Sequence, residues 1–583
     1  MTNNRIVINA MEPRAALGAY DAGNGRFTLY APTQNVAGSR DGIAELMKVE
    51  PKDVHFIATN VGGSFGMKGA IFPEYACLLH ATRELGRPVK WVDTRSTSFV
   101  SDHHGRDHEF TLELALDKDG HFLAVRANGV ANMGAYLSPF GPLIPTFNIA
   151  KHLNSVYRTP LIVVDTKCVF TNTPSITAYR GAGRPEGNYY MERLVETAAA
   201  EMGIDGAELR RRNHIQPDQI PYKSPTGSTY DSGDFPAMLE EALQRADHAG
   251  FAARKAESEK RGKLRGFGIG QFLEVTAPLT KELGGIRFEA DGTVTLLTGS
   301  HDHGQGHWTP MAQIVSQRLG VPFDKIRLMQ TDSDQLKTGS GTGGSKSLMS
   351  SGTAFIHASD KVVEKGKLAA SYVLEAGVAD IEFRDGRFGI TGTDRGIGIM
   401  ELAQRLSASA GLPEDCPTSL DTEHVNEMGP PTYPNGCHVC EVEIDPWTGV
   451  TEVVRYTMVG DFGTVVNPII VDGQLHGGVM QGIGQCLMER TVFSEDGQLA
   501  SGSFTDYAMP RADDAPFFAS FSRPAPATTN PLGAKGCGEA GCGGSMTSVM
   551  NAVVDALRPL GIRHIDMPAT PYLVWKAIQQ ARG

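Results

Sequence analysis

One carboxylate stands inside a loop of small residues near the end of the chain. Glu539 lies in residues 533–544, GAKGCGEAGCGG, where every other residue except Lys535 is Gly, Ala or Cys. Glycine lets backbone N–H groups close on a ligand, which Glu539 would then face. Residues 545–557 carry apolar side chains at helical spacing after potential N-caps, so Glu539 is predicted just before a helix N-terminus, where anions bind well. The alternative for a single loop is a solvated glutamate among glycines.

The same arrangement of strand, glycine loop and helix recurs along the chain. Residues 61–69 (VGGSFGMKG), 177–184 (TAYRGAGR) and 299–306 (GSHDHGQG) each follow a predicted strand and precede a predicted helix. Another glycine loop, residues 338–347, precedes a helix of small residues. Several helix N-termini that converge would hold one extended ligand with several negative charges. The pattern therefore favours a large phosphorylated cofactor.

Polar residues within these loops are candidate ligand contacts. Gln305 stands between two glycines, and its amide can both donate to and accept from a phosphate or ring. Arg180 and Arg184 could contact an anion, support their loop, or pair with surface carboxylates. His301, His303 and His307 could form a zinc cluster, although histidines between a strand and a helix more often cap and pack.

Nucleotide motifs are weak by comparison. Residues 339–344 (GSGTGG) fit GxGxxG, but a polar run precedes them instead of a strand, which disfavours a dinucleotide-binding fold. Lys68 follows Gly66 at the wrong spacing for a phosphate-binding Walker loop. A phosphotransferase is therefore disfavoured.

The elements that must position these loops alternate between strands and helices over 583 residues. This alternation predicts an α/β fold with mixed sheets and helices on their faces. A charged helical stretch near residues 238–263 suggests a division into a first domain at 1–245, a bridging segment at 246–265 and a second domain at 266–583.

Composition restricts the partners. A formal net charge of -12 argues against nucleic acid, and no apolar run reaches the roughly 18 residues of a spanning helix, which argues against the membrane. The 8 cysteines show neither an iron–sulfur spacing nor a disulfide framework, so a cytoplasmic location is expected.

Seven segments, taken in order, resemble one family. They are NAMEPRA from Asn9, GGSFGMK, AYRGAGRPEGNYYMERL, DHGQGH, NPIIVDGQLHGG, DYAMPRADD and GAKGCGEAG. The chain resembles the molybdenum subunit of the xanthine dehydrogenase, aldehyde oxidoreductase and carbon monoxide dehydrogenase family, in its bacterial multi-subunit form. The resemblance covers nearly the whole chain and implies two molybdopterin-binding halves.

The resemblance also implies a cofactor and its contacts. The cofactor would be molybdopterin cytosine dinucleotide, with molybdenum held by the pterin dithiolene and no metal ligand from the protein. Glu539, Gln34 and Arg180 match the family's catalytic positions. The matching cofactor contacts are Gly63, Phe65, Gly66, Arg180, Gly181, Gln305, Gly306, Gly344, Ser345, Ser347, Lys535, Gly536 and Gly538.

The reaction implied by the resemblance inserts an oxygen from water at an aldehyde or N-heteroaromatic C–H. Glu539 would be the general base, ionised because the cationic metal centre and the helix N-terminus favour its charge. Two electrons would pass to partner subunits that carry [2Fe–2S] clusters and FAD, and the assembly would be a dimer of heteromers.

Three departures from the family pattern qualify the resemblance. Carbon monoxide oxidisers place a copper-binding cysteine directly after the loop arginine, where this chain has Gly181, and purine oxidisers have a phenylalanine near Ala182. Family chains usually carry a further α/β domain before Asn9, so a separate chain would supply it or this chain is truncated. The alternatives are therefore a carbon monoxide dehydrogenase-like large subunit and a cofactor-binding half without activity of its own.

Overall fold

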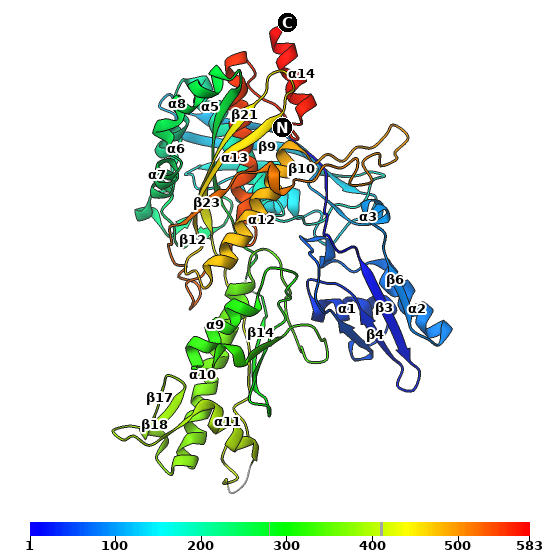
Figure 1. The fold of residues 1–583 in the computed structure, drawn as a ribbon, viewed down its shortest axis with the longest axis vertical. Coiled ribbons are helices and arrows are strands. Elements are labelled where there is room, and N and C mark those ends of the chain that lie inside the picture. Colours follow the sequence, from blue (N-terminus) through cyan, green and yellow to red (C-terminus); the bar gives the residue numbers. More distant parts are fainter. Residues whose placement is uncertain (279, 409–411) are drawn as a thin grey trace.

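The computed structural model describes residues 1–278, 280–408 and 412–583. A main body contains both chain termini, and two lobes extend from it side by side (Figure 1). One lobe is formed by residues 15–92 near the N-terminus, and the other by residues 283–425 in the middle of the chain. The prediction of an α/β fold with mixed sheets and helices on their faces is confirmed.

The body contains two four-stranded sheets. The first has the order β1-β8-β9-β10, in which β8 and β9 are antiparallel and β10 is parallel to β9. The second has the order β13-β21-β22-β23. The strands are β1 (Thr2–Asn3), β8 (His108–Leu116), β9 (Phe122–Gly134), β10 (Leu161–Phe170), β13 (Leu264–Leu273), β21 (Asn435–Ile444), β22 (Thr451–Asp461) and β23 (Phe518–Ser522).

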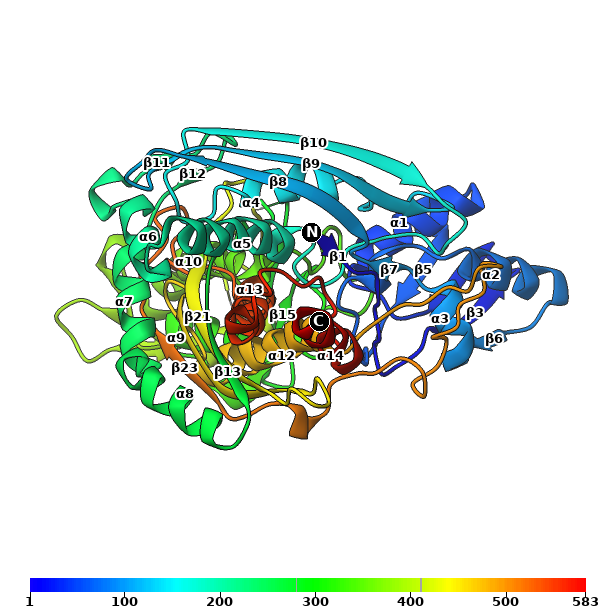
Figure 2. The same cartoon turned by 90° about the horizontal axis from the view of Figure 1, so that it is seen from above.

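Three long helices fill the space between these sheets. They are α5 (Arg184–Met202), α12 (Pro468–Leu487) and α13 (Ala540–Leu557). In Figure 2, the long strands β8, β9 and β10 run along the upper edge of the body, α5 lies next to them, and α13 lies on the other side of α5. One hydrophobic core joins side chains from both sheets and all three helices, from Phe110 to Ile578. Residues of the first and last parts of the chain therefore share one core.

The N-terminal lobe is a mixed sheet with two helices. Its strand order is β5-β4-β3-β6, and its elements are β3 (Ala15–Asp21), β4 (Arg26–Tyr30), α1 (Val36–Met47), β5 (Val54–Ile57), α2 (Pro73–Leu85) and β6 (Val89–Val92). Pro73 begins α2 and Gly86 ends it in the left-handed conformation, as the sequence predicts.

The second lobe contains another mixed sheet with the order β16-β15-β14-β20. Its main elements are β14 (Leu283–Phe288), β15 (Val294–Leu297), α9 (Trp308–Leu319), β16 (Ile326–Met329), α10 (Ser347–Leu374) and β20 (Thr422–Val425). The tip consists of β17 (Ile381–Arg384), β18 (Arg387–Ile390), β19 (Gly396–Gly398) and α11 (Ile399–Ala408). The segment just before α10 contacts the body, because the hydroxyl of Ser345 accepts the backbone N–H of Glu539.

Shorter elements complete the chain. They are β2 (Ile6–Val7), α3 (Arg95–Ser101), β7 (His104–Gly105), α4 (Ile149–His152), α6 (Gly206–Asn213), β11 (Tyr222–Lys223), β12 (Thr229–Tyr230), α7 (Phe235–Arg245), α8 (Phe251–Lys260) and α14 (Pro571–Arg582).

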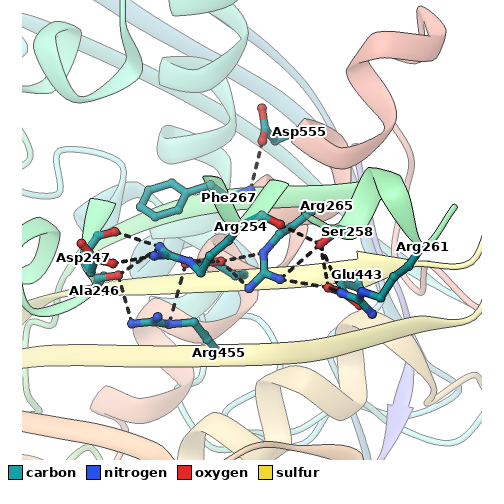
Figure 3. Close-up of polar contacts among 11 residues, drawn as sticks. Ala246, Asp247, Arg254, Ser258, Arg261, Arg265, Phe267, Glu443, Arg455 and Asp555 are labelled. Atoms are coloured by element: carbon teal, nitrogen blue, oxygen red, sulfur yellow. Dashed lines mark hydrogen bonds and ion pairs between the residues drawn. The ribbon is translucent and has the colours of Figure 1, made fainter. Parts of the chain in front are cut away.

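An ionic network holds α8 against the second body sheet (Figure 3). Arg254 of α8 and Arg265 of β13 both donate to the carboxylate of Glu441 on β21, at 2.7 and 2.8 Å. Arg265 and Arg261 also pair with Glu443. Residues 246–265, the predicted bridging segment, therefore pack against a sheet whose other strands come from residues 435–522. The division at 245 and 265 stays a prediction.

Candidate active site

The glycine loops meet around one cavity of about 790 Å³ between the body and the two lobes. Its wall includes Gln34, Phe65 and Gly66 from the N-terminal lobe and residues 303–305 from the second lobe. The body contributes residues 178–180 and residues 535–539, and the loop before α10 contributes residues 342–348. Segments as distant in the sequence as Gln34 and Glu539 thus share one site, as the recurring loops predict.

Glu539 is held in place by the helix that it begins. It is the N-cap residue of α13, and α13 lies directly on β13. Gly266 and Gly268 of β13 permit this approach, because a Cβ atom on them would lie 1.9 and 2.0 Å from the carbonyl oxygens of Ala552 and Ser548. Any larger residue at these positions would push α13, and with it Glu539, away from the sheet.

The carboxylate of Glu539 is fixed by two donors. The backbone N–H of Gly181 donates to its Oε1 at 2.8 Å, and the hydroxyl of Ser345 donates to its Oε2 at 3.2 Å. Ser345 also accepts the backbone N–H of Glu539 at 3.0 Å, and Arg184 Nη1 lies 3.7 Å from Oε2. The side chain is only 13% exposed, so these groups, not bulk water, stabilise its charge.

Gln34 projects into the same cavity from the loop after β4. Its Oε1 accepts from the Ser64 hydroxyl and from the backbone N–H of Gly66 at 3.0 Å. Its Nε2 donates to the Thr342 carbonyl at 2.7 Å, which leaves the second hydrogen of that nitrogen for a ligand. The side chain therefore links the N-terminal lobe to the loop before α10.

Arg180 ties two parts of the wall together. Its Nε donates to the carbonyl of Gly538 at 2.6 Å, and its Nη2 donates to the carbonyl of Gln474 at 2.8 Å. The next residue, Gly181, has φ +100, and a Cβ there would lie 2.3 Å from Pro185 Cγ. Arg180 thus holds the Glu539 loop against α12, while the turn that it begins requires glycine.

Two rows of backbone amides in the wall have no partner within the described residues. No hydrogen-bond acceptor is found for the N–H groups of Gly343, Gly344 and Ser345, just before α10, or for those of residues 536–538. A 28-residue helix begins at Ser347, so its positive end adds to the first row. Unpaired amides at a helix N-terminus, facing a large cavity, fit the phosphates and polar edges of a nucleotide-bearing pterin.

Comparison with known proteins agrees with this geometry. Residues 1–214 and 241–516 match two families described as molybdopterin cofactor-binding domains. A carbon monoxide dehydrogenase large chain from Hydrogenophaga pseudoflava is 32% identical over 98% of this chain and 73% of its own length. The chain belongs to the xanthine dehydrogenase, aldehyde oxidoreductase and carbon monoxide dehydrogenase family. It is therefore a molybdopterin-binding subunit of a molybdenum-containing oxidoreductase.

Other relatives in this family act on different substrates. The 6-hydroxypseudooxynicotine dehydrogenase complex subunit gamma of Paenarthrobacter nicotinovorans is 32% identical over 98% of this chain and 72% of its own length. Among solved structures, quinoline 2-oxidoreductase from Pseudomonas putida 86 has a TM-score of 0.93 and 30% identity, covering 99% of this chain and 75% of that chain. The CO dehydrogenase of Oligotropha carboxidovorans has the same TM-score with 31% identity, covering 100% and 74%.

Most of the residues predicted to bind the cofactor line the cavity. Those in the wall are Gln34, Phe65, Gly66, Arg180, Gln305, Gly344, Ser345, Ser347, Lys535, Gly536, Gly538 and Glu539. Gly63, Gly181 and Gly306 are not among the lining residues, although Gly181 donates to Glu539. A Cβ on Gly63 would lie 3.1 Å from the Phe65 ring, so this glycine supports the loop from behind.

Two of the lining side chains are engaged within the protein. Gln305 accepts from the backbone N–H of His303 at 2.8 Å and donates to the carbonyl of His301 at 3.3 Å, so both ends of its amide are used inside its own loop. The ammonium of Lys535 pairs with Asp461 at 2.5 Å, and both side chains are buried. Their roles as cofactor contacts remain predictions, and Lys535 can reach the cavity only through its backbone and carbon chain.

The histidines of the third loop are neutral. Burial, with a smaller contribution from neighbouring histidines, lowers the pKa of His303 to about 3, and burial lowers the pKa of His307 to about 4. Within the described part of the chain, the histidine and carboxylate groups close enough to share a metal ion are His55, Asp332 and Asp334 instead. His55 and Asp332 already share a hydrogen bond of 2.8 Å, and Asp334 pairs with Arg26.

Two features of the site lack a signal in the sequence. Glu274 is buried and shares Arg184 with Glu539, since Arg184 lies 3.7 Å from a carboxylate oxygen of each. It follows β13, a strand that sequence reasoning did not identify. Phe140, Leu143 and Phe147 form an apolar part of the cavity wall from a connection that carries no motif. Both could be found only once distant segments were placed together.

No helix in residues 1–278, 280–408 or 412–583 is long and apolar enough to cross a bilayer.

Proposed function

We propose that the chain binds molybdopterin cytosine dinucleotide and catalyses hydroxylation of an electron-poor C–H, in an aldehyde or an N-heteroaromatic compound, with oxygen from water. The observation that carries this proposal is the burial of Glu539 beside two rows of unpaired amides in one cavity. When bound, the molybdenum centre supplies the two-electron oxidation and activates the oxygen donor. Binding the cofactor, holding the substrate and moving the proton would fall to residues of this chain.

The roles of the residues follow from their contacts. Residues 343–345 and 536–538 would hold the phosphates and pterin with backbone N–H groups, and Gln34 would donate through its free amide hydrogen. Glu539 would take a proton at Oε2 or Oε1 as general base, since Gly181 and Ser345 hold it in position. Arg180 would keep the Glu539 loop closed.

The substrate class draws support from the wall of the cavity. Phe140, Leu143 and Phe147 are partly exposed and line it, so an apolar, flat molecule could enter beside them. Relatives named for quinoline and a nicotine derivative suggest the same class. Electrons would pass to partner subunits with [2Fe–2S] clusters and FAD, in a cytoplasmic dimer of heteromers.

The test is Glu539→Gln in this chain, coexpressed and purified with the proposed [2Fe–2S] and FAD subunits. Molybdenum content should stay at the wild-type level, whereas dye reduction with the best substrate from a screen of aldehydes, purines and pyridines should fall by about 100-fold or more, as expected for a lost general base. Glu382→Gln, an exposed carboxylate on β17, is the matched control. Full turnover in Glu539→Gln would refute the assignment of the base.

A carbon monoxide dehydrogenase-like activity is the second candidate, supported by 32% identity to such a large chain. Gly181 stands where the family's carbon monoxide oxidisers carry a copper-binding cysteine, and its φ of +100 disfavours any side chain there. Stoichiometric copper in the purified assembly would favour this candidate. Absence of molybdenum in the coexpressed assembly would instead indicate a cofactor-binding half without activity.

A further inference from the structure

Glu274 is a second carboxyl group buried beside Glu539. It follows β13 and is 2% exposed, and its backbone N–H donates to the carbonyl of Pro434 at 2.8 Å. Neither oxygen of its side chain accepts a hydrogen bond from any described residue. Its cationic neighbour, Arg184, approaches only to 3.7 Å between Nε and Oε1. A buried carboxylate without a donor is costly, so its protonation state has to be explained.

The groups around Glu274 do not supply a full countercharge. Arg184 faces both carboxyl groups, at 3.7 Å from each, and spends two of its N–H groups on the carbonyls of Val275 and Gly181. His152 accepts the N–H of Val275 at Nε2, and burial, then Arg184, lower its pKa to about 3, so it is neutral. Arg180 donates to the carbonyl groups of Gly538 and Gln474 and forms no ion pair with Glu274 among the described residues.

The remaining neighbours are not cations either. Cys537 keeps its proton, because burial and then the charge of Glu274 raise its pKa to about 12. Ser345 is a neutral neighbour, whose hydroxyl donates to Glu539. Burial, and then the charge of Glu539, raise the pKa of Glu274 to about 8, while Arg184 opposes the rise. Two adjacent carboxyl groups with one shared guanidinium retain a proton between them.

We propose that Glu274 and Glu539 form a carboxyl pair that holds one proton, carried by Glu274 and donated in a hydrogen bond to the ionised Glu539. The proton removes the unpaired negative charge of Glu274 and lets one of its oxygens donate, and it gives Glu539 a third donor beside Gly181 and Ser345. Glu274 is thus a positioning residue. The positioning role of Glu274 rests on the proposed function, in which Glu539 is the base. The carboxyl pair itself does not require bound cofactor.

Infrared spectroscopy of the cofactor-free protein tests the pair directly. Glu274→Gln should remove the C=O stretch of a protonated carboxylic acid at pH 7. In Glu539→Gln the same band should titrate at a lower pH than in the wild type, because the neighbouring negative charge is gone. The control is Glu489→Gln, another buried carboxyl group with a raised pKa but outside the cavity wall, whose band should be insensitive to Glu539→Gln.

Kinetics of the loaded assembly provide the second readout. Wild-type kcat should decline above pH about 8, where Glu274 loses its proton, and this alkaline decline should disappear in Glu274→Gln. Glu274→Leu, which offers no donor to Glu539, should lose kcat by about 10-fold or more, the usual effect of removing a hydrogen bond to a charged group, and Glu274→Gln should lose less. KM should stay unchanged, since Glu274 does not line the cavity.

Each outcome separates the pair from the function. An unshifted band in Glu539→Gln, or an alkaline decline that persists in Glu274→Gln, would overturn the pair even if Glu539 proves to be the base. A shifted band together with full turnover in Glu539→Gln would keep the pair and refute the proposed function.

Discussion

Replacing Lys535 distinguishes a structural role for its charge from a role in cofactor binding. The ammonium lies 2.5 Å from Asp461, and neither side chain is more than 1% exposed. Lys535→Met would leave Asp461 buried without its cation, although it would still accept from the N–H groups of Gly463, Ala525 and Asn435 at 2.9 to 3.0 Å. Breaking a buried ion pair on one side costs about 3–5 kcal/mol, and the remaining donors favour the lower end, about 3 kcal/mol.

The expected change in melting temperature follows from the size of the chain. At roughly 2.1 cal/mol/K per residue, unfolding 583 residues together has an entropy of about 1.2 kcal/mol/K. A loss of about 3 kcal/mol therefore lowers the melting temperature of the cofactor-free protein by about 2 to 3 °C. Calorimetry of Lys535→Met against wild type measures it. Adding Asp461→Asn should recover part of the loss by removing the unpaired charge.

The matched control is an ion pair at the surface. Lys337 pairs with Glu423 at 2.8 Å, but its side chain is 75% exposed. Exposed pairs contribute at most about 1 kcal/mol, so Lys337→Met should shift the melting temperature by less than about 1 °C. If Lys535→Met melts like the control yet loses its molybdenum, the charge of Lys535 acts on the cofactor and the structural reasoning is refuted.

Two further predictions concern the cavity loop and pH. Gly66→Ala should lower turnover by about 10-fold or more, because its Cβ would lie 1.9 Å from the Ala178 carbonyl oxygen. The control is Gly86→Ala, since Gly86 also has a positive φ but lies in open space, and this variant should keep its turnover. Equal turnover in the two variants would contradict the prediction. For Glu489, burial raises the pKa from 4.5 to about 7, so its stabilising effect is complete below pH 4.5 and lost as pH rises through 7. Glu489→Gln should remove about 3 kcal/mol of this decline in stability. The melting temperature of the variant should therefore fall less than that of the wild type between pH 5 and pH 8. Parallel curves of melting temperature against pH would count against the prediction.

Local signals in the sequence predict the elements around the site well. Pro73 and Gly86 delimit a helix, because the first helical position needs no N–H donor and glycine adopts the left-handed conformation freely after the last one. Glu539 begins its helix as expected, and the glycine loops gather at one cavity, because close backbone approach to a shared ligand requires glycine in each of them. These properties depend on neighbours in the chain or on one common partner.

Other parts of the site depend on contacts between distant segments and were not predicted. β13 carries Gly266, Gly268 and Gly270 at alternate positions, a pattern that disfavours a strand when it is considered alone. The glycines are explained only by α13, whose backbone presses on them from almost 300 residues away. Because this strand was not predicted, the position of Glu274, which directly follows it, could not be predicted either. The charge partner of Lys535 is likewise 74 residues distant.

Gly181 connects the chemistry of the site with its backbone geometry. Its N–H reaches Glu539 only because the turn adopts φ +100 and passes close to Pro185. A side chain at this position would need both to tolerate that φ and to displace the proline ring, which would move the N–H away from the carboxylate. In this backbone, a cysteine at position 181 is therefore incompatible with the hydrogen bond from the residue 181 N–H to the Glu539 carboxylate. The glycine that departs from the copper pattern is thus the residue that holds Glu539, our proposed base, through its backbone N–H.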